Sequence, residues 1–375
     1  MKRVAIISSL SIVLAAAATY FVSNTASKAI PRSKALNGAT QSTGGDTNIL
    51  LLGLDSRRDN NGNDLPRKLL DLMHVGSSSS IGGYNTNTMI LIHIPAGGKQ
   101  AVAVSIPRDD YVDVPGLGGH KIKEAYGLAK YYAELKLIKA GVPNPLREQQ
   151  SREAGRTATI KTITQLLGVP IDHFAEVNLV GFYDLATALG GVQVCLKHAV
   201  NDLQYSGAVF PAGLQTITGV DALKFVRQRH GLPNGDLDRT HRQQAFITGV
   251  ITKFRTQGIF SDIGKISALL TVAKKDVVID QGWDVLSFLP QAKALTGGRI
   301  TFHTAPIVKY AMINHQSVNQ IDPVAVRAFV QNLFYPKPVA KGTASPTPSP
   351  KPTKLNFTAQ ANGKSVDGSG IPCVN

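Results

Sequence analysis

The stretch NILLLGLDSR, residues 48–57, decides the fold, because a largely apolar run ends abruptly in Asp55, Ser56 and Arg57. Two more short apolar runs, MILIHI at residues 89–94 and AVAVSI at residues 101–106, are likewise bounded by Gly, Pro or Asp. Runs this short that are apolar at successive positions are typical of strands buried on both faces of a sheet. We therefore predict that the three runs are central strands.

Helix-like segments alternate with these runs. Residues 158–167 place Ile160, Ile163 and Leu167 on one helical face and are followed by Gly168, a typical residue after the last helical turn. The pattern predicts further elements in chain order: a helix at 180–189, a strand at 192–196, a helix at 219–227, a long helix capped by Asp238, and a helix begun by Asp322-Pro323. This alternation predicts an α/β fold class, with one layered domain whose central mixed sheet is flanked by helices.

The two ends of the chain differ from this patterned region. Met1-Lys2-Arg3 precedes a mostly apolar run that reaches Val22, about the ~20 residues that a bilayer crossing needs. We expect residues 1–23 to form a cytoplasmic end and a single transmembrane anchor, so that the rest of the chain lies outside the cell membrane. A cleaved signal peptide is the alternative and gives the same location. The other predicted parts are a spacer at 24–46, the patterned domain at 47–335, and a Pro/Ser/Thr-rich disordered tail at 336–375.

The composition indicates an anionic partner. Forty Lys and Arg residues against 25 Asp and Glu residues give a formal net charge of +15. Such a surface attracts polyanions, and export argues against nucleic acid and in favour of wall polymers or lipid headgroups. The two cysteines, Cys195 and Cys373, are too few for a disulfide framework or a multi-cysteine metal site. A single bridge and two unpaired thiols are both compatible with the sequence.

The segment FVRQRHGLPNGDLDRTHRQQ, residues 225–244, concentrates four arginines: Arg227, Arg229, Arg239 and Arg242. This density is costly unless an anion is bound, and planar guanidinium groups suit bidentate contacts to phosphate. Gln243 follows Arg239 by four residues and therefore shares its helical face. We interpret the segment as a diphosphate site. The alternative is a solvated basic surface whose arginines pair with Asp236 and Asp238.

Two strand ends carry further candidates. Arg108 and Asp109 come directly after the run at 101–106, and Asp55 comes directly after the run at 48–54. Ligands bind at the carboxyl ends of strands in open α/β sheets, so these side chains are candidate ligand contacts. Asp55 offers a carboxylate to a hard cation such as Mg²⁺. A strand-end ion pair for Arg108 and Asp109, and a simple turn at Asp55, are the alternatives.

Several familiar sites have no support in the sequence. It contains no GxSxG nucleophile elbow, no GxxxxGK[ST] phosphate loop and no His or Cys spacing that suits zinc. Gly116-Leu-Gly-Gly119 follows a proline and predicts a plain turn. The familiar serine-hydrolase, nucleoside-triphosphatase and zinc-enzyme classes are therefore disfavoured.

Five segments in order resemble the motif set of the LytR-CpsA-Psr family. They are NILLLGLDSR, VAVSIPRDDYVDVPG, KIKEAY, LLGVPIDHFAEVNLVGFYDLATALGGV and ALKFVRQRHGLPNGDLDRTHRQQ. The resemblance implies that residues 47–335 are a catalytic α/β domain with a long hydrophobic groove for a polyprenyl tail. It also implies an activity in cell-wall biogenesis. The enzyme, a transferase of phosphorus-containing groups, moves a glycopolymer from a polyprenyl-pyrophosphate carrier to peptidoglycan.

The resemblance also implies which residues act. Those that match pyrophosphate-binding positions are Arg108, Lys121, Arg227, Arg229, Arg239 and Gln243, to which the arginine cluster adds Arg242. The implied ligands of Mg²⁺ or Mn²⁺ are Asp55 and an aspartate of an R-x-D-T element. Here that element is Asn85-Thr-Asn-Thr88, with Asn85 in the place of arginine and Asn87 in the place of aspartate. Asn87 still offers a carbonyl oxygen, but the loss of a carboxylate weakens metal binding. The longer loop at 58–83 and the Pro-rich tail resemble those of actinobacterial members.

The implied mechanism uses positioning and charge. The arginines neutralise the diphosphate and stabilise the leaving polyprenyl phosphate, assisted by Mg²⁺ near Asp55. We expect Arg108, Asp109, Arg227 and Arg229 to be catalytic, with Asp109 as the nearest candidate for a general base. Two alternatives are a pyrophosphatase that hydrolyses lipid-linked precursors and a non-catalytic envelope protein that binds polyprenyl phosphates.

Overall fold

The computed structural model describes residues 28–76, 83–97, 100–258, 262–285, 288, 300–336, 366–367 and 370–375. The expected membrane anchor at 1–23 and the Pro-rich part of the expected tail lie outside these residues. Within the described ranges, no helix is both long enough and apolar enough to cross a membrane.

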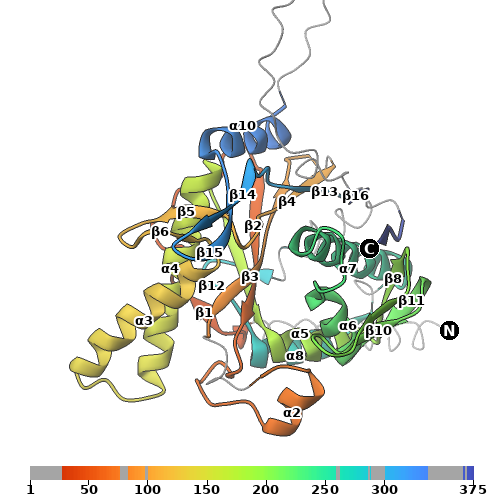
Figure 1. Cartoon of the computed structure of the whole chain (residues 1–375). Helices are drawn as coiled ribbons and strands as arrows, with labels where there is room; N and C mark the ends of the chain where they lie inside the picture. The colour runs from red at the N-terminus through yellow and green to blue at the C-terminus, as the bar shows by residue number, and fades with distance from the viewer. Residues whose placement is uncertain are drawn as a thin grey trace, which may run out of the picture.

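A mixed sheet of eight strands forms the centre of the fold, in the order β1-β12-β7-β2-β3-β4-β13-β16 (Figure 1). The strands are β1 (Arg32–Ser33), β2 (Thr47–Asp55), β3 (Asn85–Ile94), β4 (Ala101–Ser105), β7 (His173–Asn178), β12 (Val277–Asp280), β13 (Ile300–Thr304) and β16 (Val366–Asp367). β2 runs parallel to β7 and antiparallel to β3, and β4 runs parallel to β13. The three runs predicted as central strands are β2, β3 and β4, which are neighbours in the middle of the sheet, so that prediction is confirmed.

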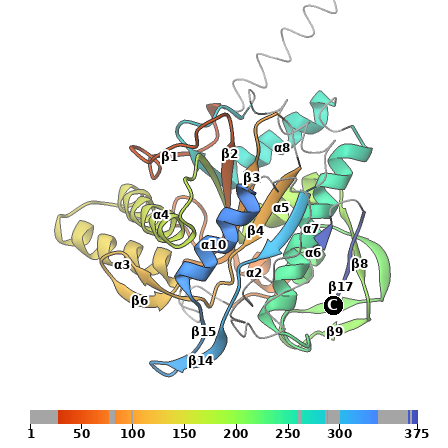
Figure 2. The same cartoon turned by 90° about the horizontal axis from the view of Figure 1, so that it is seen from above.

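Helices cover both faces of this sheet. One layer contains α3 (Glu124–Lys139), α4 (Leu146–Leu167) and α10 (Pro323–Phe334), and the other contains α5 (Leu179–Ala188), α6 (Gly219–Arg227), α7 (Asp236–Thr256) and α8 (Ile263–Asp276). Figure 2 shows α3 and α4 on the opposite side of the sheet from α6 and α7. Successive residues of β2 alternate between the layers, since Leu50 packs in a cluster with Ile163 of α4 and Leu51 in a cluster with Ile247 of α7. Burial on both faces explains why the run is apolar throughout.

Shorter elements surround these layers. The predicted turn at Gly116 connects β5 (Tyr111–Val114) and β6 (Gly118–Lys121) in a hairpin. A second hairpin consists of β14 (Lys309–Ile313) and β15 (Gln316–Gln320). The other short elements are α2 (Arg67–Leu72), the pair β9 (Val200–Asp202) and β10 (Ala208–Phe210), and a sheet of β11 (Gly213–Ile217), β8 (Val192–Leu196) and β17 (Cys373–Val374).

The predicted helices form, and the starts of two of them differ from the prediction. α4 ends as predicted, with Gly168 in the left-handed conformation at φ 69°. However, it begins at Leu146, well before the apolar pattern at 158–167. Its first part buries charged side chains, among them Arg152 and Arg156, and therefore shows no apolar period. α10 begins as predicted, because the Asp322 carboxylate accepts hydrogen bonds from the first backbone N–H groups of the helix.

The predicted cap of α7 is wrong. The helix begins at Asp236, directly after Gly235, and the Asp238 side chain lies inside the first turn. The Asp238 carboxylate instead accepts hydrogen bonds from the backbone N–H and the side-chain amide of Asn234. Gly235 has φ 51°, a conformation that favours glycine and lets the chain turn sharply into the helix.

Part of the expected spacer belongs to the folded domain. β1 pairs in parallel with β12, and Ile30 and Leu36 are buried in the core clusters. These residues are too few to form an apolar period, so the sequence did not indicate them. The boundary predicted at residue 47 is therefore placed too late.

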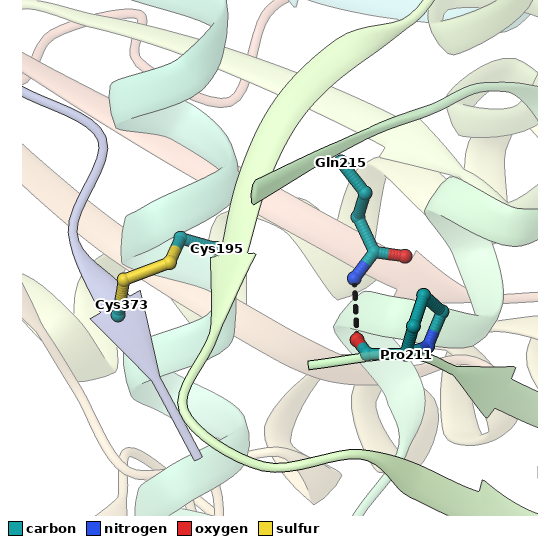
Figure 3. The surroundings of a disulfide bond; sticks show 4 residues. All are labelled: Cys195, Pro211, Gln215 and Cys373. Carbon is teal, nitrogen blue, oxygen red and sulfur yellow. Dashed lines mark hydrogen bonds between the residues drawn. A yellow bond between two sulfur atoms is a disulfide. The ribbon is translucent and has the colours of Figure 1, made fainter. Parts of the chain in front are cut away.

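A disulfide joins Cys195 of β8 to Cys373 of β17 (Figure 3). β17 pairs in parallel with β8, and Val374 is buried in the cluster beneath. The bridge decides between the two alternatives that the sequence left open for the cysteines. It also corrects the expectation of a disordered tail for residues 370–375.

Candidate active site

A cavity of about 670 Å³ lies between the sheet and the helices of the α7 layer. Strands β2 and β7 and helices α5, α6 and α7 form its walls. Much of the lining is aliphatic or aromatic, including Leu51, Val177, Phe182, Val226, Phe246 and Val250. A lining of this kind accommodates an apolar chain.

The charged part of the cavity lining is mostly cationic. Among the described residues that line the cavity, six are Arg or Lys, against the two carboxylates of Asp55 and Asp202. The six are Arg57, Arg108, Lys123, Arg227, Arg229 and Arg239. Arg227 lies in the electrostatic range of Arg57 and Arg108, and Arg239 in that of Arg108 and Arg229, so the cations form one group. Cations gathered in this way favour an anionic ligand.

The ends of strands and helices bring these side chains together. Arg108 follows β4, Arg227 is the last residue of α6, and Arg239 lies in the first turn of α7. A bulge between Gly53 and Leu54 shifts the pairing of β2 with β3. Gly53 permits this close approach, since a Cβ there would lie 2.8 Å from the Cβ of Thr88. Beyond the bulge, Asp55 at the end of β2 and Arg57 line the cavity together with the other cations.

Asp55 and Asn87, the predicted metal ligands, contact each other across β2 and β3. Asn87 Nδ2 donates a hydrogen bond to Asp55 Oδ2 (2.8 Å), and Arg57 Nη1 donates one to Asp55 Oδ1 (2.8 Å). The remaining oxygen, Asn87 Oδ1, accepts a hydrogen bond from Arg108 Nη1 (2.9 Å). All three side-chain oxygens therefore already have a protein donor.

These residues do not fit a dedicated site for a divalent cation. Mg²⁺ takes about six oxygen ligands, whereas this pair supplies one carboxylate, and Arg57 already balances its charge. Over the part of the chain that the structure describes, no group of three or more His, Cys, Asp or Glu side chains is arranged to hold a metal.

Asp109 lies behind the cavity lining, among cations. Its carboxylate is 2.7 Å from Lys123 Nζ, 3.4 Å from Lys121 Nζ and 3.6 Å from Arg108 Nε. Burial alone would raise the pKa of Asp109, but Arg108 and the two lysines reverse that effect and lower it. A carboxylate held ionised in this way is a weak base, so its surroundings favour a positioning role over the general-base role expected for it.

The most enclosed arginines lack full compensation within the protein. Burial lowers the pKa of Arg239 to about 10, with Asp236 opposing the shift, and burial also lowers the pKa of Arg227. Both side chains keep their charge at neutral pH. The Nε atoms of Arg57 and Arg239 are buried and have no hydrogen-bond partner among the described residues. Desolvated cations of this kind bind an anion strongly, because the anion restores the interactions that water has lost.

Asp236 holds two arginines of the site together. Its carboxylate accepts a hydrogen bond from Arg239 Nη2 (3.0 Å) and lies 3.1 Å from Arg108 Nε. The solvated-surface alternative pairs the arginines with this aspartate, and that pairing does occur. It occurs inside the site, where Arg239 is only 5% exposed.

Other candidate residues are placed differently from the prediction. Gln243 lines the cavity as expected, but Lys121 does not, and Lys123 takes its place. Arg57 was missed as well, although its position two residues after Asp55 was a usable signal. Arg242 lies elsewhere, one turn beyond Arg239. There its guanidinium is 5.0 Å from the centre of the Phe225 ring, and its Nε donates a hydrogen bond to the Asn375 carbonyl oxygen.

The chain is similar to proteins of cell-wall biosynthesis. Residues 11–333 match the LytR_cpsA_psr family. The chain is 41% identical over 307 residues to the cell wall biosynthesis protein LcpA of Corynebacterium glutamicum and 28% identical over 287 residues to the probable cell wall biosynthesis protein LcpB of that organism. These alignments cover 81% and 76% of this chain but only 57% and 61% of the two relatives. The chain thus spans less than two thirds of their length.

Solved structures share the fold. TagV of Bacillus subtilis superposes with a TM-score of 0.56 at 18% identity, covering 78% of this chain and 98% of that one. The structure of TagT bound to LI-WTA superposes with a TM-score of 0.52 at 19% identity, covering 80% and 95%. At this level of identity the likeness establishes the α/β architecture alone.

Proposed function

This chain belongs to the LytR_cpsA_psr family, and on that basis we propose that it is a transferase of cell-wall biogenesis. It moves a glycopolymer, together with one phosphate, from a polyprenyl-pyrophosphate carrier to peptidoglycan. In this proposal residues 1–23 anchor it in the cell membrane and the α/β domain lies outside the cell.

One observation carries the proposal: a single cavity has both a cationic group and an apolar wall. A polyprenyl-linked glycan presents the matching order of chemistry, since a diphosphate separates a polar glycan from an apolar chain. A nucleotide would leave the apolar wall without a partner. A fatty acid would leave most of the six cations without one.

The mechanism follows from the placement of charge. The diphosphate oxygens contact the cationic group, which includes Arg108, Arg227, Arg229, Arg239 and Lys123. A hydroxyl oxygen of the wall glycan forms a bond to the phosphorus next to the carried glycan. The bond from that phosphorus to the bridging oxygen breaks, and polyprenyl monophosphate leaves with that oxygen and the electron pair. The cations stabilise the charge that develops on the leaving phosphate, which is the main requirement of phosphoryl transfer.

The test compares the full chain with one variant in the site and one outside it. A synthetic polyprenyl-diphosphate oligosaccharide and peptidoglycan are supplied, and formation of polyprenyl monophosphate is measured. Arg227→Ala should lower the rate at least about 100-fold, the usual scale for the loss of one group that stabilises transition-state charge. Arg67→Ala should not, because Arg67 is an exposed residue of α2 that pairs with Asp71.

Two outcomes would replace the proposal. If wild type binds the donor and leaves its diphosphate intact, the chain is a lipid-binding envelope protein. If wild type releases polyprenyl monophosphate but attaches no glycan to peptidoglycan, it is a pyrophosphatase.

A further inference from the structure

A second, smaller cavity of about 280 Å³ lies beside the first. Residues 233–237, at the start of α7, form one wall, and Tyr310 and Asn319 of the β14–β15 hairpin form the other. This places residues that are about 80 positions apart in sequence around one space.

The two cavities meet at one carboxylate. Asp236 lines the small cavity, while its carboxylate lies 2.9 Å from Arg239 Nη2 and 3.1 Å from Arg108 Nε, both of which line the large cavity. A group bound against Asp236 is therefore one side chain away from the cations that would hold the donor diphosphate.

The charges of the two cavities are opposite. Asp236 is the charged side chain among the described residues lining the small cavity, whereas six cations line the large one. Burial first, and then Asp236 and Asp238, raise the pKa of Tyr310, which places its phenol near both carboxylates. An anion such as a second diphosphate is repelled from this space. A neutral molecule rich in hydroxyl groups can donate hydrogen bonds to the carboxylate instead.

The lining and the volume of the small cavity suit a sugar ring. Tyr310 is 52% exposed and presents an aromatic ring at the cavity wall. Asn319 is fixed, because its backbone N–H donates to the Asp109 carbonyl oxygen (2.8 Å) and its Nδ2 donates to Asp110 Oδ1 (2.9 Å). Aromatic rings that combine an apolar face with polar neighbours pack on ligands that are apolar on one side and polar on the other, as sugars are. At 280 Å³ the space is just below the usual range of ligand pockets, about 300–1,000 Å³, so it takes one ring.

We propose that this small cavity is the acceptor subsite: it binds one sugar ring of the wall glycan and directs its hydroxyl at the donor phosphorus. The inference rests on the proposed function. Tyr310 stacks on the ring, and Asp236 accepts a hydrogen bond from the attacking hydroxyl. When the hydroxyl oxygen bonds to phosphorus and polyprenyl monophosphate leaves, the hydroxyl proton is released to solvent, and Asp236 positions the hydroxyl. Asp236 thus links the acceptor to Arg108 and Arg239 on the donor side.

The experiment separates acceptor binding from donor cleavage. With the full chain, the polyprenyl-diphosphate oligosaccharide and a soluble peptidoglycan disaccharide fragment, KM is measured for each substrate. Tyr310→Ala should raise the KM of the acceptor about tenfold, the upper scale for an aromatic contact, and change the KM of the donor less than twofold. Tyr310→Phe keeps the ring and should stay within about threefold of wild type, since the stacking surface remains. Met312→Ala is the matched control, because Met312 is an exposed residue of the same strand and does not line the cavity.

A binding measurement keeps the inference testable if wild type transfers nothing. Saturation-transfer NMR with the disaccharide fragment alone should show binding to wild type, Tyr310→Phe and Met312→Ala and its loss in Tyr310→Ala. If wild type shows no turnover but the fragment binds in this pattern, the proposed function is wrong and the subsite is still supported. If the acceptor KM of Tyr310→Ala equals that of wild type, or if the fragment binds Tyr310→Ala as well as wild type, the subsite is wrong.

Discussion

Arg57 Nη1 and Asp55 Oδ1 form an ion pair of 2.8 Å at the end of β2, where both residues line the cavity. Arg57 is almost fully buried, with a side-chain exposure of 2%, against 16% for Asp55. The guanidinium thus gives the carboxylate its counter-charge from within the chain. Asn87 contributes a neutral amide that donates a hydrogen bond to Asp55. A second carboxylate in its place would need a further cation to balance its charge.

We predict that donor cleavage by wild type does not require added Mg²⁺ and continues in EDTA. Asn87→Asp places a second carboxylate beside Asp55 and should create a site for a divalent cation. Titration with Mn²⁺ followed by electron paramagnetic resonance should therefore show binding to Asn87→Asp and none to wild type. Asn201→Asp, an exposed position on β9, is the control and should behave as wild type. A wild-type rate that falls more than tenfold in EDTA and returns with Mg²⁺ would contradict the prediction.

Arg239 and Arg242 lie three residues apart on α7 and should have different roles. Arg239 should contribute to the rate of donor cleavage and Arg242 to the stability of the fold. Arg239 lines the cavity and contacts Asp236, so Arg239→Ala should lower donor cleavage at least about 100-fold. Arg242 packs on Phe225 and the end of the chain, so Arg242→Ala should cost about 2 kcal/mol of unfolding free energy and leave the rate of the folded protein unchanged. Steady-state rates and urea unfolding measure the two effects. Equal losses of rate in both variants would mean that Arg242 belongs to the site.

The sequence predicted the centre of the fold and most of the cationic group for identifiable reasons. β2, β3 and β4 are buried on both faces of the sheet, so nearly all of their residues are apolar and the runs can be recognised in the sequence. Arg227, Arg229 and Arg239 lie within one short segment, and their density indicated an anion site. Arg108 was predicted from its place after the run at residues 101–106. The two members that the sequence did not indicate, Arg57 and Lys123, reach the site from other segments.

What the sequence did not indicate depends on contacts between distant segments. Asp236 meets Tyr310 and Asn319 only because the β14–β15 hairpin folds against the start of α7. Cys195 and Cys373 meet only because β17 pairs with β8. The start of α4 was missed because its buried side chains are charged, and a charged interior has no apolar period. These packing relations also show that a fragment cut at residues 47 and 335 would lose β1, β16 and β17.

The buried charges at the start of α4 predict how stability depends on pH. Glu148 Oε1 lies 2.7 Å from Arg152 Nε, and Oε2 lies 2.9 Å from Lys130 Nζ. Burial alone would raise the pKa of Glu148, but Arg152, Tyr84 and Lys130 reverse this effect and lower it from 4.5 to about 2. A carboxyl whose pKa is lowered on folding stabilises the protein above its unfolded pKa and loses that contribution as the pH falls through the folded value.

Glu148→Gln should therefore lower the unfolding free energy at pH 7 by about 3 kcal/mol, the free-energy equivalent of this shift. The difference from wild type should shrink as the pH falls below 4.5 and vanish near pH 2. Urea unfolding followed by the fluorescence of Trp283, the single tryptophan of the chain, measures it. Glu153→Gln provides a comparison, because Glu153 is a partly exposed residue of the same helix that pairs with Arg156. A difference between wild type and Glu148→Gln that stays constant from pH 7 to pH 2 would show that the ion pairs are not its cause.

The most direct test of the central claim follows the phosphorus atom next to the carried glycan. The full chain is mixed with peptidoglycan and a polyprenyl-diphosphate oligosaccharide that carries ³²P in the glycan-side phosphate only. We predict that the label appears in washed peptidoglycan, while unlabelled polyprenyl monophosphate accumulates in equal amount. Label that is released as soluble glycan phosphate, or that stays with the lipid, would contradict the claim that this cavity transfers a glycan phosphate to the wall.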